Sequence, residues 1–167
     1  MYYLNTFYIY SVIGFIIEST MYKLMDSNRH SGIFYGPITP IYGIGVLIIL
    51  FLYKMIYEKL NINKYLKPIL LFISSIILLT LIEWIGGHLI NTIFSVDLWD
   101  YSNKNYNFGK YICLEVSLCW GLLSLVYVYI VKPFLDRFIK RIPKLATIIF
   151  TLVFIIDLIA IFVTKRF

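Results

Sequence analysis

The sequence predicts an all-α, polytopic membrane protein with about five transmembrane helices. Sixty per cent of the 167 residues are apolar and only 14% are charged, against roughly 25% charged residues in ordinary globular chains. Several apolar stretches also reach about 20 residues, the length that a helix needs to cross the hydrocarbon core of a bilayer. A soluble domain of this size could not bury so much apolar surface. We therefore expect one transmembrane helical domain over residues 1–167, surrounded by the lipid bilayer.

Five stretches have the required length. In chain order they are Tyr2 to Met25, Pro37 to Tyr57, Pro68 to about Phe94, Gly109 to Val131 and Pro143 to Thr164. The prolines at 37, 68 and 143 are expected to begin helices, because the first turn of a helix does not need their missing N–H. Pro133 is expected to end the fourth helix. The first stretch lacks the basic segment and cleavage site of a signal peptide, so we expect a retained helix there.

Lysine and arginine are concentrated in two of the connecting segments. The second carries Lys54, Lys59, Lys64 and Lys67, and the fourth carries Lys132, Arg137, Lys140, Arg141 and Lys144. Basic loops favour the cytoplasmic side, which predicts a multi-pass protein of the cell (cytoplasmic) membrane with its N-terminus inside. The first and third loops then face outward. This topology accounts for the net charge of +6, and no nucleic-acid partner is expected.

Four acidic residues interrupt the apolar stretches: Glu18, Glu83, Glu115 and Asp157. A carboxylate inside a membrane costs several kcal/mol, so each is a candidate functional residue. At 1.5 Å of helix rise per residue, all four lie in the half of the membrane that faces the first and third loops. We expect Glu18, Glu83 and Glu115 to share a polar site. Asp157 taken alone is more typical of a structural hydrogen bond between helices.

Small residues accompany two of these acids at helical spacing, which places each set on one helix face. The sets are Ser11, Gly14 and Glu18, and Thr80, Glu83 and Gly87. Close helix packing would explain the glycines equally well. Glu83 and His88 are five residues apart and project in different directions, so no metal site is predicted and any cofactor is unknown.

The two outward loops contain the remaining candidate residues. The first, from Arg29 to Gly43, has two prolines and three glycines among aromatic residues. It either dips back toward the acids or forms a tight turn before a proline-started helix. In the third loop, Asp100 either pairs with Arg29 or is a solvated charge beside Trp99.

Several motifs occur together in a fixed order. They are Gly14–Glu18, Gly32–Pro37, Pro40–Gly43, Glu83, Trp99-Asp100-Tyr101-Ser102, and Gly109 followed by Ile112-Cys113-Leu114. Over about residues 10–125 this pattern resembles the bacterial membrane family named Putative ABC-transporter type IV, or CmpB-like. The resemblance implies a membrane location and a link to transport. The family pattern has an arginine just before the Ile-Cys-Leu step, where this chain has Lys110 and Tyr111. The chain has no Walker motif, so any ATPase would be a separate protein.

These observations predict a small permease-like or substrate-binding protein with a carboxylate-lined polar site in the outer half of the membrane. The expected substrate-binding residues are Glu18, Arg29, Tyr35, Tyr42, Glu83, Asp100, Tyr101 and Glu115. Carboxylates suit protons or a cationic or polar substrate. Five helices enclose a narrow interior, so a homo-oligomer or a separate partner subunit is expected. The alternatives are an intramembrane enzyme, which would act on a lipid or lipid-linked headgroup with Glu18 or Glu83 as general base, and a structural subunit without a site.

Overall fold

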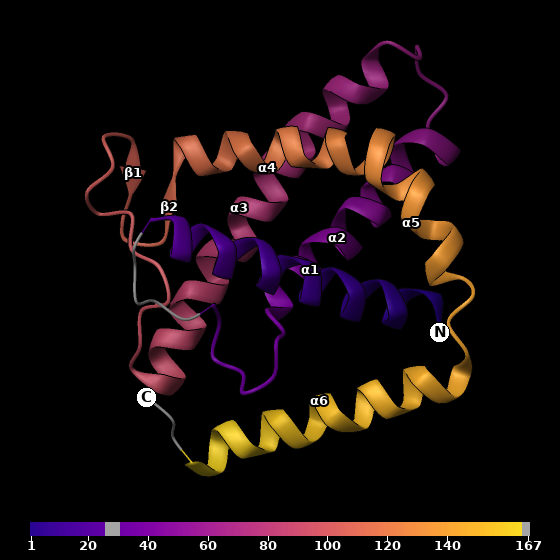
Figure 1. Cartoon of the computed structure of the whole chain (residues 1–167). Helices are drawn as coiled ribbons and strands as arrows, with labels where there is room; N and C mark the ends of the chain where they lie inside the picture. Colours follow the sequence, from indigo (N-terminus) through magenta and orange to yellow (C-terminus); the bar gives the residue numbers. More distant parts are fainter. Residues whose placement is uncertain (26–30, 165–167) are drawn as a thin grey trace. The chain divides into compact units, whose positions relative to one another are not determined.

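The computed structural model describes residues 1–25 and 31–164, and α-helix is its dominant regular structure. The elements, drawn in Figure 1, are α1 (Tyr2–Leu24), α2 (Pro40–Tyr53), the π-helical segment η1 (Lys54–Lys59), α3 (Leu66–Phe94), β1 (Asn107–Phe108), β2 (Ile112–Cys113), α4 (Leu114–Val126), the π-helical segment η2 (Tyr127–Val131), α5 (Lys132–Ile139) and α6 (Lys144–Thr164). The all-α fold class is confirmed.

Within the described residues, four helical segments are long and apolar enough to cross a membrane. They are Pro40–Lys59, Leu66–Phe94, Leu114–Ile139 and Lys144–Thr164. The remaining long helix, α1, has 23 residues. At 1.5 Å per residue it is about 34 Å long, enough to span the roughly 30 Å hydrocarbon core. The surfaces of these helices remain largely exposed and apolar, as expected for helices that are surrounded by lipid.

Three expected helix boundaries are wrong. Helix α2 begins at Pro40 rather than at Pro37. Helix α4 begins at Leu114 rather than at Gly109, because residues 107–113 form a short antiparallel hairpin. Pro133 does not stop the fourth helix, which continues through α5. The turn before it, η2, is π-helical, and the changed hydrogen-bond register of such a turn accommodates a residue without an N–H.

The chain divides into two compact units, so a single domain over residues 1–167 stays a prediction. Unit 1 comprises residues 1–44 and 138–167. Polar side chains join α1 to α6 in this unit: the hydroxyl of Thr147 donates to Asn5 Oδ1 at 2.6 Å, and the hydroxyls of Tyr8 and Thr151 lie 3.0 Å apart. In a membrane, such bonds help to hold helices together where lipid provides no hydrophobic drive.

The segment 31–39 of unit 1 runs back along α1. The backbone N–H of Thr39 donates to the carbonyl of Ser11 at 3.0 Å. Ser11 is 13 residues before the end of α1, a distance of about 20 Å along the helix. A Cβ on Gly43 would overlap Phe7 and Ser11, so glycine permits the close approach of α2 to α1. The loop therefore dips back along α1, as one alternative expected, and it is followed by a helix that starts at a proline, as the other expected.

Unit 2 comprises residues 45–137. Its most extensively packed pair is α3 and α4. Helix α4 presents small buried residues to this interface: Ser117, Gly121 and Ser124. A Cβ on Gly121 would lie 2.7 Å from the Phe72 ring. Small residues thus let the two backbones approach closely, and this packing fixes one end of α3 beside the start of α4.

Candidate functional site: a buried glutamate beneath a loop cap

Glu83 is the most deeply buried acid among the described residues. It lies within the α3 span, and only 3% of its surface is exposed. The Tyr101 hydroxyl donates to Glu83 Oε1 at 2.9 Å, and the Trp120 indole N–H donates to Oε2 at 3.0 Å. Both oxygens therefore have a partner, as a buried polar group requires. Trp120 belongs to α4, whereas Tyr101 belongs to the loop after α3.

That loop, residues 95–113, is called the cap below. Glu83, Gly87 and Asn91 follow one another at intervals of four residues, so they lie on one face of α3. The cap rests on this face. A Cβ on Gly87 would overlap the Tyr111 ring, so only glycine leaves room for this side chain. Asn91 donates from Nδ2 to Asp97 Oδ1 at 3.0 Å. Each of the three α3 positions thus has a cap residue against it.

The cap has a defined backbone. Helix α3 ends where Ser95 adopts a left-handed conformation, with φ of 58°. Strands β1 and β2 pair antiparallel, and Gly109 between them has φ of 68°, a value that suits glycine. The N–H of Tyr101 donates to the carbonyl of Lys110 at 2.8 Å. These bonds hold Tyr101 in the position from which it reaches Glu83.

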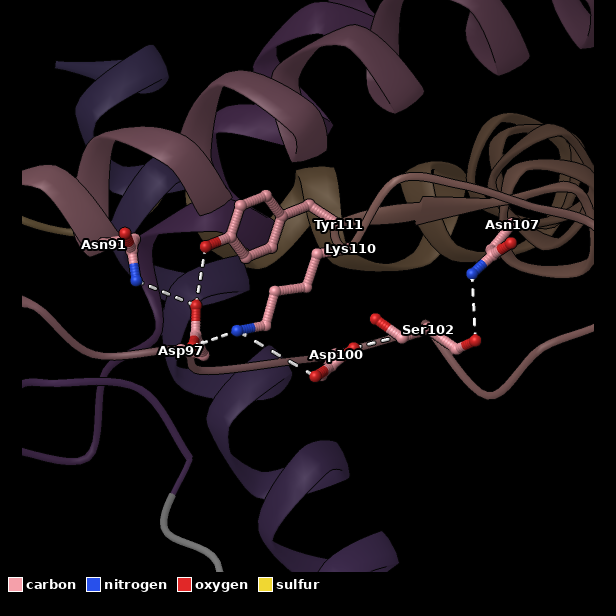
Figure 2. A network of polar contacts seen from close by, with 7 residues as sticks. All are labelled: Asn91, Asp97, Asp100, Ser102, Asn107, Lys110 and Tyr111. Carbon is pink, nitrogen blue, oxygen red and sulfur yellow. Dashed lines mark hydrogen bonds and ion pairs between the residues drawn. The ribbon is translucent and has the colours of Figure 1, made fainter.

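Asp97 organises the charged part of the cap, as Figure 2 shows. Its carboxylate pairs with the ammonium of Lys110 and accepts a hydrogen bond from the Tyr111 hydroxyl at 2.6 Å. The hydrogen bond from Lys110, followed by that from Tyr111, lowers the pKa of Asp97. The same bond to Asp97 raises the pKa of Lys110. Both groups are therefore held in their charged forms around neutral pH.

Asp100 lies at the edge of this network. Its carboxylate is exposed, accepts a bond from the N–H of Ser102 at 2.8 Å, and lies 4.0 Å from the Lys110 ammonium. Hydrogen bonding by Ser102 lowers the pKa of Asp100. One alternative for Asp100 was a pairing with Arg29, which belongs to the segment 26–30 and so lies outside the described residues. Glu115 is exposed in the first turn of α4.

Glu18 has its own polar surroundings in unit 1. The hydroxyl of Tyr22 donates to its Oε1 at 2.8 Å, and the hydroxyl of Ser31 donates to its Oε2 at 2.8 Å. Ser31 is buried and also shares a hydrogen bond with Thr39. Glu18 thereby fixes the start of the segment that runs back along α1.

Tyr35 and Tyr42 serve different contacts in the same unit. The backbone N–H groups of Tyr35 and Gly36 donate to the two carboxylate oxygens of Asp157 at 3.0 and 2.9 Å. The side chain of Tyr42 packs against Gly14, where a Cβ would overlap its ring. Asp157 is thus bonded to the backbone of the returning segment, whereas the sequence favoured a hydrogen bond between helices.

The structure brings together some of the expected site residues. Glu83 and Tyr101 are hydrogen-bonded in unit 2. Glu18, Tyr35 and Tyr42 belong to unit 1, so one polar site shared by Glu18, Glu83 and Glu115 stays a prediction. Two partners of these residues were not predicted from the sequence: Ser31, which bonds Glu18, and Trp120, which bonds Glu83. The bonded pair Asn91 and Asp97 in and beside the cap was not predicted either. Continuing the Glu83–Gly87 spacing by one more turn would have found Asn91, whereas no local signal marks the others.

The helices and the buried, hydrogen-bonded carboxylate define a multi-pass α-helical membrane protein in which a polar face of α3 lies beneath the cap. A family model matches residues 5–164, and the chain belongs to the family described as Putative ABC-transporter type IV. The match extends beyond the motifs that carried the resemblance, so the family covers both compact units. No curated protein and no solved structure matches the chain.

Proposed function

We propose that the protein is a small permease-like or substrate-binding component of a transport system. The proposed site is the face of α3 beneath the cap. Family membership supports the link to transport. The observation that carries the proposal is the position of Glu83: its carboxylate is 3% exposed inside a membrane span, and one of its two donors belongs to a loop rather than to a helix.

This arrangement suggests how a substrate gains access. Displacement of the cap would remove Tyr101 from one carboxylate oxygen, while Trp120 on α4 would still hold the other. A protonated amine or another cationic group can then replace the tyrosine hydroxyl, because a charged donor binds a carboxylate more strongly than a neutral one. The proposed substrate class is therefore small cationic or polar solutes, or protons.

The amide variant Glu83→Gln separates binding from folding. The glutamine oxygen can accept from Trp120, and its NH₂ group can donate to the Tyr101 oxygen, so the buried contacts persist without a carboxylate. The control is Glu58→Gln, which makes the same change at an exposed position in η1, outside the face of α3 beneath the cap.

The test is solute counterflow in proteoliposomes that contain the full-length protein, with labelled choline, spermidine and arginine as probes. A pH-sensitive dye inside the vesicles reports proton movement. We expect at least one probe or protons to move, with about a tenfold or greater loss in Glu83→Gln, as for removal of a charge-assisted bond of about 1.5 kcal/mol or more. Glu58→Gln should retain most of the activity. Equal activity of wild type and Glu83→Gln would overturn the proposal.

We also propose a cytoplasmic-membrane location with the N-terminus inside, and assembly with a separate ATPase subunit or with further copies. The concentration of basic residues in the second and fourth connecting segments supports the orientation, and the missing Walker motif supports the separate ATPase. With Cys113 and Cys119 replaced by serine, a cysteine at Asn107 should react with an impermeant maleimide from outside intact cells. A cysteine at Asn63 should not, and the reverse labelling would invert the orientation.

A further inference from the structure

A cluster of tyrosines and lysines lies at the end of unit 2 opposite the cap. Two π-helical segments occur at this end, η1 before the turn to α3 and η2 before α5. π-helical turns are rare and often occur at functional sites. Tyr57 of η1 and Tyr129 of η2 share a hydrogen bond between their hydroxyls. The two widened turns are therefore joined by one polar contact.

The tyrosine rings hold lysine side chains in place. Tyr53 and Tyr57 are stacked, with ring centroids 4.9 Å apart. The Lys132 ammonium lies 5.0 Å from the centroid of Tyr53, and the Lys67 ammonium 5.7 Å from that of Tyr57. Lys67 also donates to the Tyr57 carbonyl at 3.0 Å. Such cation–π contacts orient an ammonium without neutralising its charge.

Within residues 1–25 and 31–164, the charge of Lys67 lacks a carboxylate partner. Lys132 pairs with Asp136 at 3.0 Å, whereas in the part of the chain that the structure describes no carboxylate lies within 4.0 Å of the Lys67 ammonium. The surrounding segments add to the positive potential, with six cations and two anions, a net charge of +4. They are Lys54, Lys59, Lys64, Lys67, Lys132 and Arg137, against Glu58 and Asp136.

The tyrosine pair supplies a hydrogen-bond donor. A bond between two hydroxyls uses only one of their two hydrogens, so the other hydroxyl can donate to a further acceptor. Tyr129 is 53% exposed, which leaves the pair accessible. The cluster lies where one span ends at Lys59 and the next begins at Leu66, the level of the lipid headgroups for a membrane-spanning helix.

We propose that Lys67 and the Tyr57–Tyr129 pair form a binding site for a phosphate anion, supplied by the headgroup of an anionic phospholipid or by a soluble phosphate ester. Lys67 contributes the charge and the tyrosine pair contributes a directed hydrogen bond. Basic clusters next to a membrane span attract anionic headgroups, and the stacked rings distinguish this site from a diffuse basic surface. The inference does not depend on the proposed transport role.

The experiment measures ligand binding to the full-length protein in neutral detergent by native mass spectrometry. The probes are phosphatidylglycerol, phosphatidylcholine and glycerol 3-phosphate. Lys67→Gln removes the proposed charge, and the double variant Tyr57→Phe with Tyr129→Phe removes both hydroxyls. Lys64→Gln is the matched control, because it removes one charge at the same end, from a lysine that lies over Tyr65 instead.

We expect phosphatidylglycerol to bind more tightly than phosphatidylcholine, and Lys67→Gln to weaken that binding about tenfold. Lys64→Gln should weaken it no more than about fivefold, the effect of one lysine near an anionic surface. The double tyrosine variant should weaken it about threefold, as for a neutral hydrogen bond. Binding of glycerol 3-phosphate with the same dependence on Lys67 would support the site with a soluble source.

Two results would overturn the proposal. Equal losses in Lys67→Gln and Lys64→Gln would show only diffuse attraction by the basic end of the unit. No preference of the wild-type protein for either phosphate-bearing anion over phosphatidylcholine would show that no phosphate site exists. Circular dichroism of each variant establishes that its helices are intact, so a loss of binding can be assigned to the changed side chain.

Discussion

Replacing Tyr101 by phenylalanine should release the cap from α3 while leaving the helices packed. The variant removes the hydroxyl that donates to Glu83 Oε1 at 2.9 Å. Because Glu83 is 3% exposed, the oxygen that loses its partner stays buried for as long as the cap is closed. Leaving such an acceptor unsatisfied costs about 1 to 3 kcal/mol. Opening of the cap should therefore become about 5 to 150 times more frequent.

Amide hydrogen exchange of the full-length protein in detergent measures this opening. Two cap amides report directly, through the bonds from Tyr101 to Lys110 and from Lys104 to Tyr101, and the first amide of α4 reports through the bond from Leu114 to Tyr106. Their exchange should accelerate by the stated factor in Tyr101→Phe, whereas amides within α6 should be unchanged.

Tyr106→Phe is the matched control, since it removes a hydroxyl from the same cap at a side chain that is 68% exposed. It should leave cap exchange within about twofold of wild type, as most exposed substitutions change stability by less than about 0.5 kcal/mol. If Tyr101→Phe and Tyr106→Phe exchange alike, the bond to Glu83 does not hold the cap, and the access route proposed above loses its basis.

Three further outcomes follow from the structure. Gly87→Ala should destabilise the protein by about 1 to 3 kcal/mol through overlap with the Tyr111 ring, measured as a lower Tm. Gly45→Ala, whose Cβ would lie 3.6 Å from Leu79, should leave the Tm unchanged or slightly higher. Equal decreases of the Tm in the two variants would contradict the packing argument. The Asp97–Lys110 pair should hold the cap over a wide pH window. Because the pKa of Asp97 is lowered, its contribution to the stability of the closed cap is complete above the unfolded pKa of about 3.9 and is lost as the pH falls below that value. Because the pKa of Lys110 is raised, its contribution to the same stability is complete below the unfolded pKa of about 10.4 and is lost as the pH rises above that value. The indole N–H resonance of Trp99, which donates to the Tyr111 carbonyl, should shift only outside this window, and Asp97→Asn should abolish that dependence at the acid end. Asp157→Asn should make cleavage of the segment 31–39 by added protease about tenfold faster, since it weakens the bonds to the N–H groups of Tyr35 and Gly36. Thr164→Val, which removes the exposed hydroxyl contact with Tyr35 and a bond to the Ala160 carbonyl within α6, should have little effect.

Some contacts follow from local spacing and could be read in the sequence. The spacing of Thr80, Glu83 and Gly87 predicts that they share one face of a helix. In the structure Thr80 is hydrogen-bonded to Ser117, Glu83 is hydrogen-bonded to Trp120, and the Tyr111 ring packs against Gly87. The spacing gives the face because the helical repeat is fixed. It does not give the partners, which are 24 to 37 residues away along the chain.

Other features depend on interactions that no local pattern encodes. The fourth helix continues through Pro133, which follows the π-helical turn η2, whereas composition alone predicts a stop at proline. The link between Tyr101 and Glu83 requires that the hairpin turn at Gly109 place Lys110 opposite Tyr101. These outcomes are set by competition among long-range contacts.

Helix length and apolar composition were enough to predict an all-α membrane protein, because both must match the thickness and chemistry of the bilayer. The pattern also identified Glu83 as a candidate, because a carboxylate is costly at that depth. That this carboxylate is held by Trp120 of α4 and by Tyr101 of the cap is visible only in the folded structure. The reason is physical: solvation cost is a property of one residue and its depth, whereas the partner that offsets this cost is chosen by the folding of the whole unit.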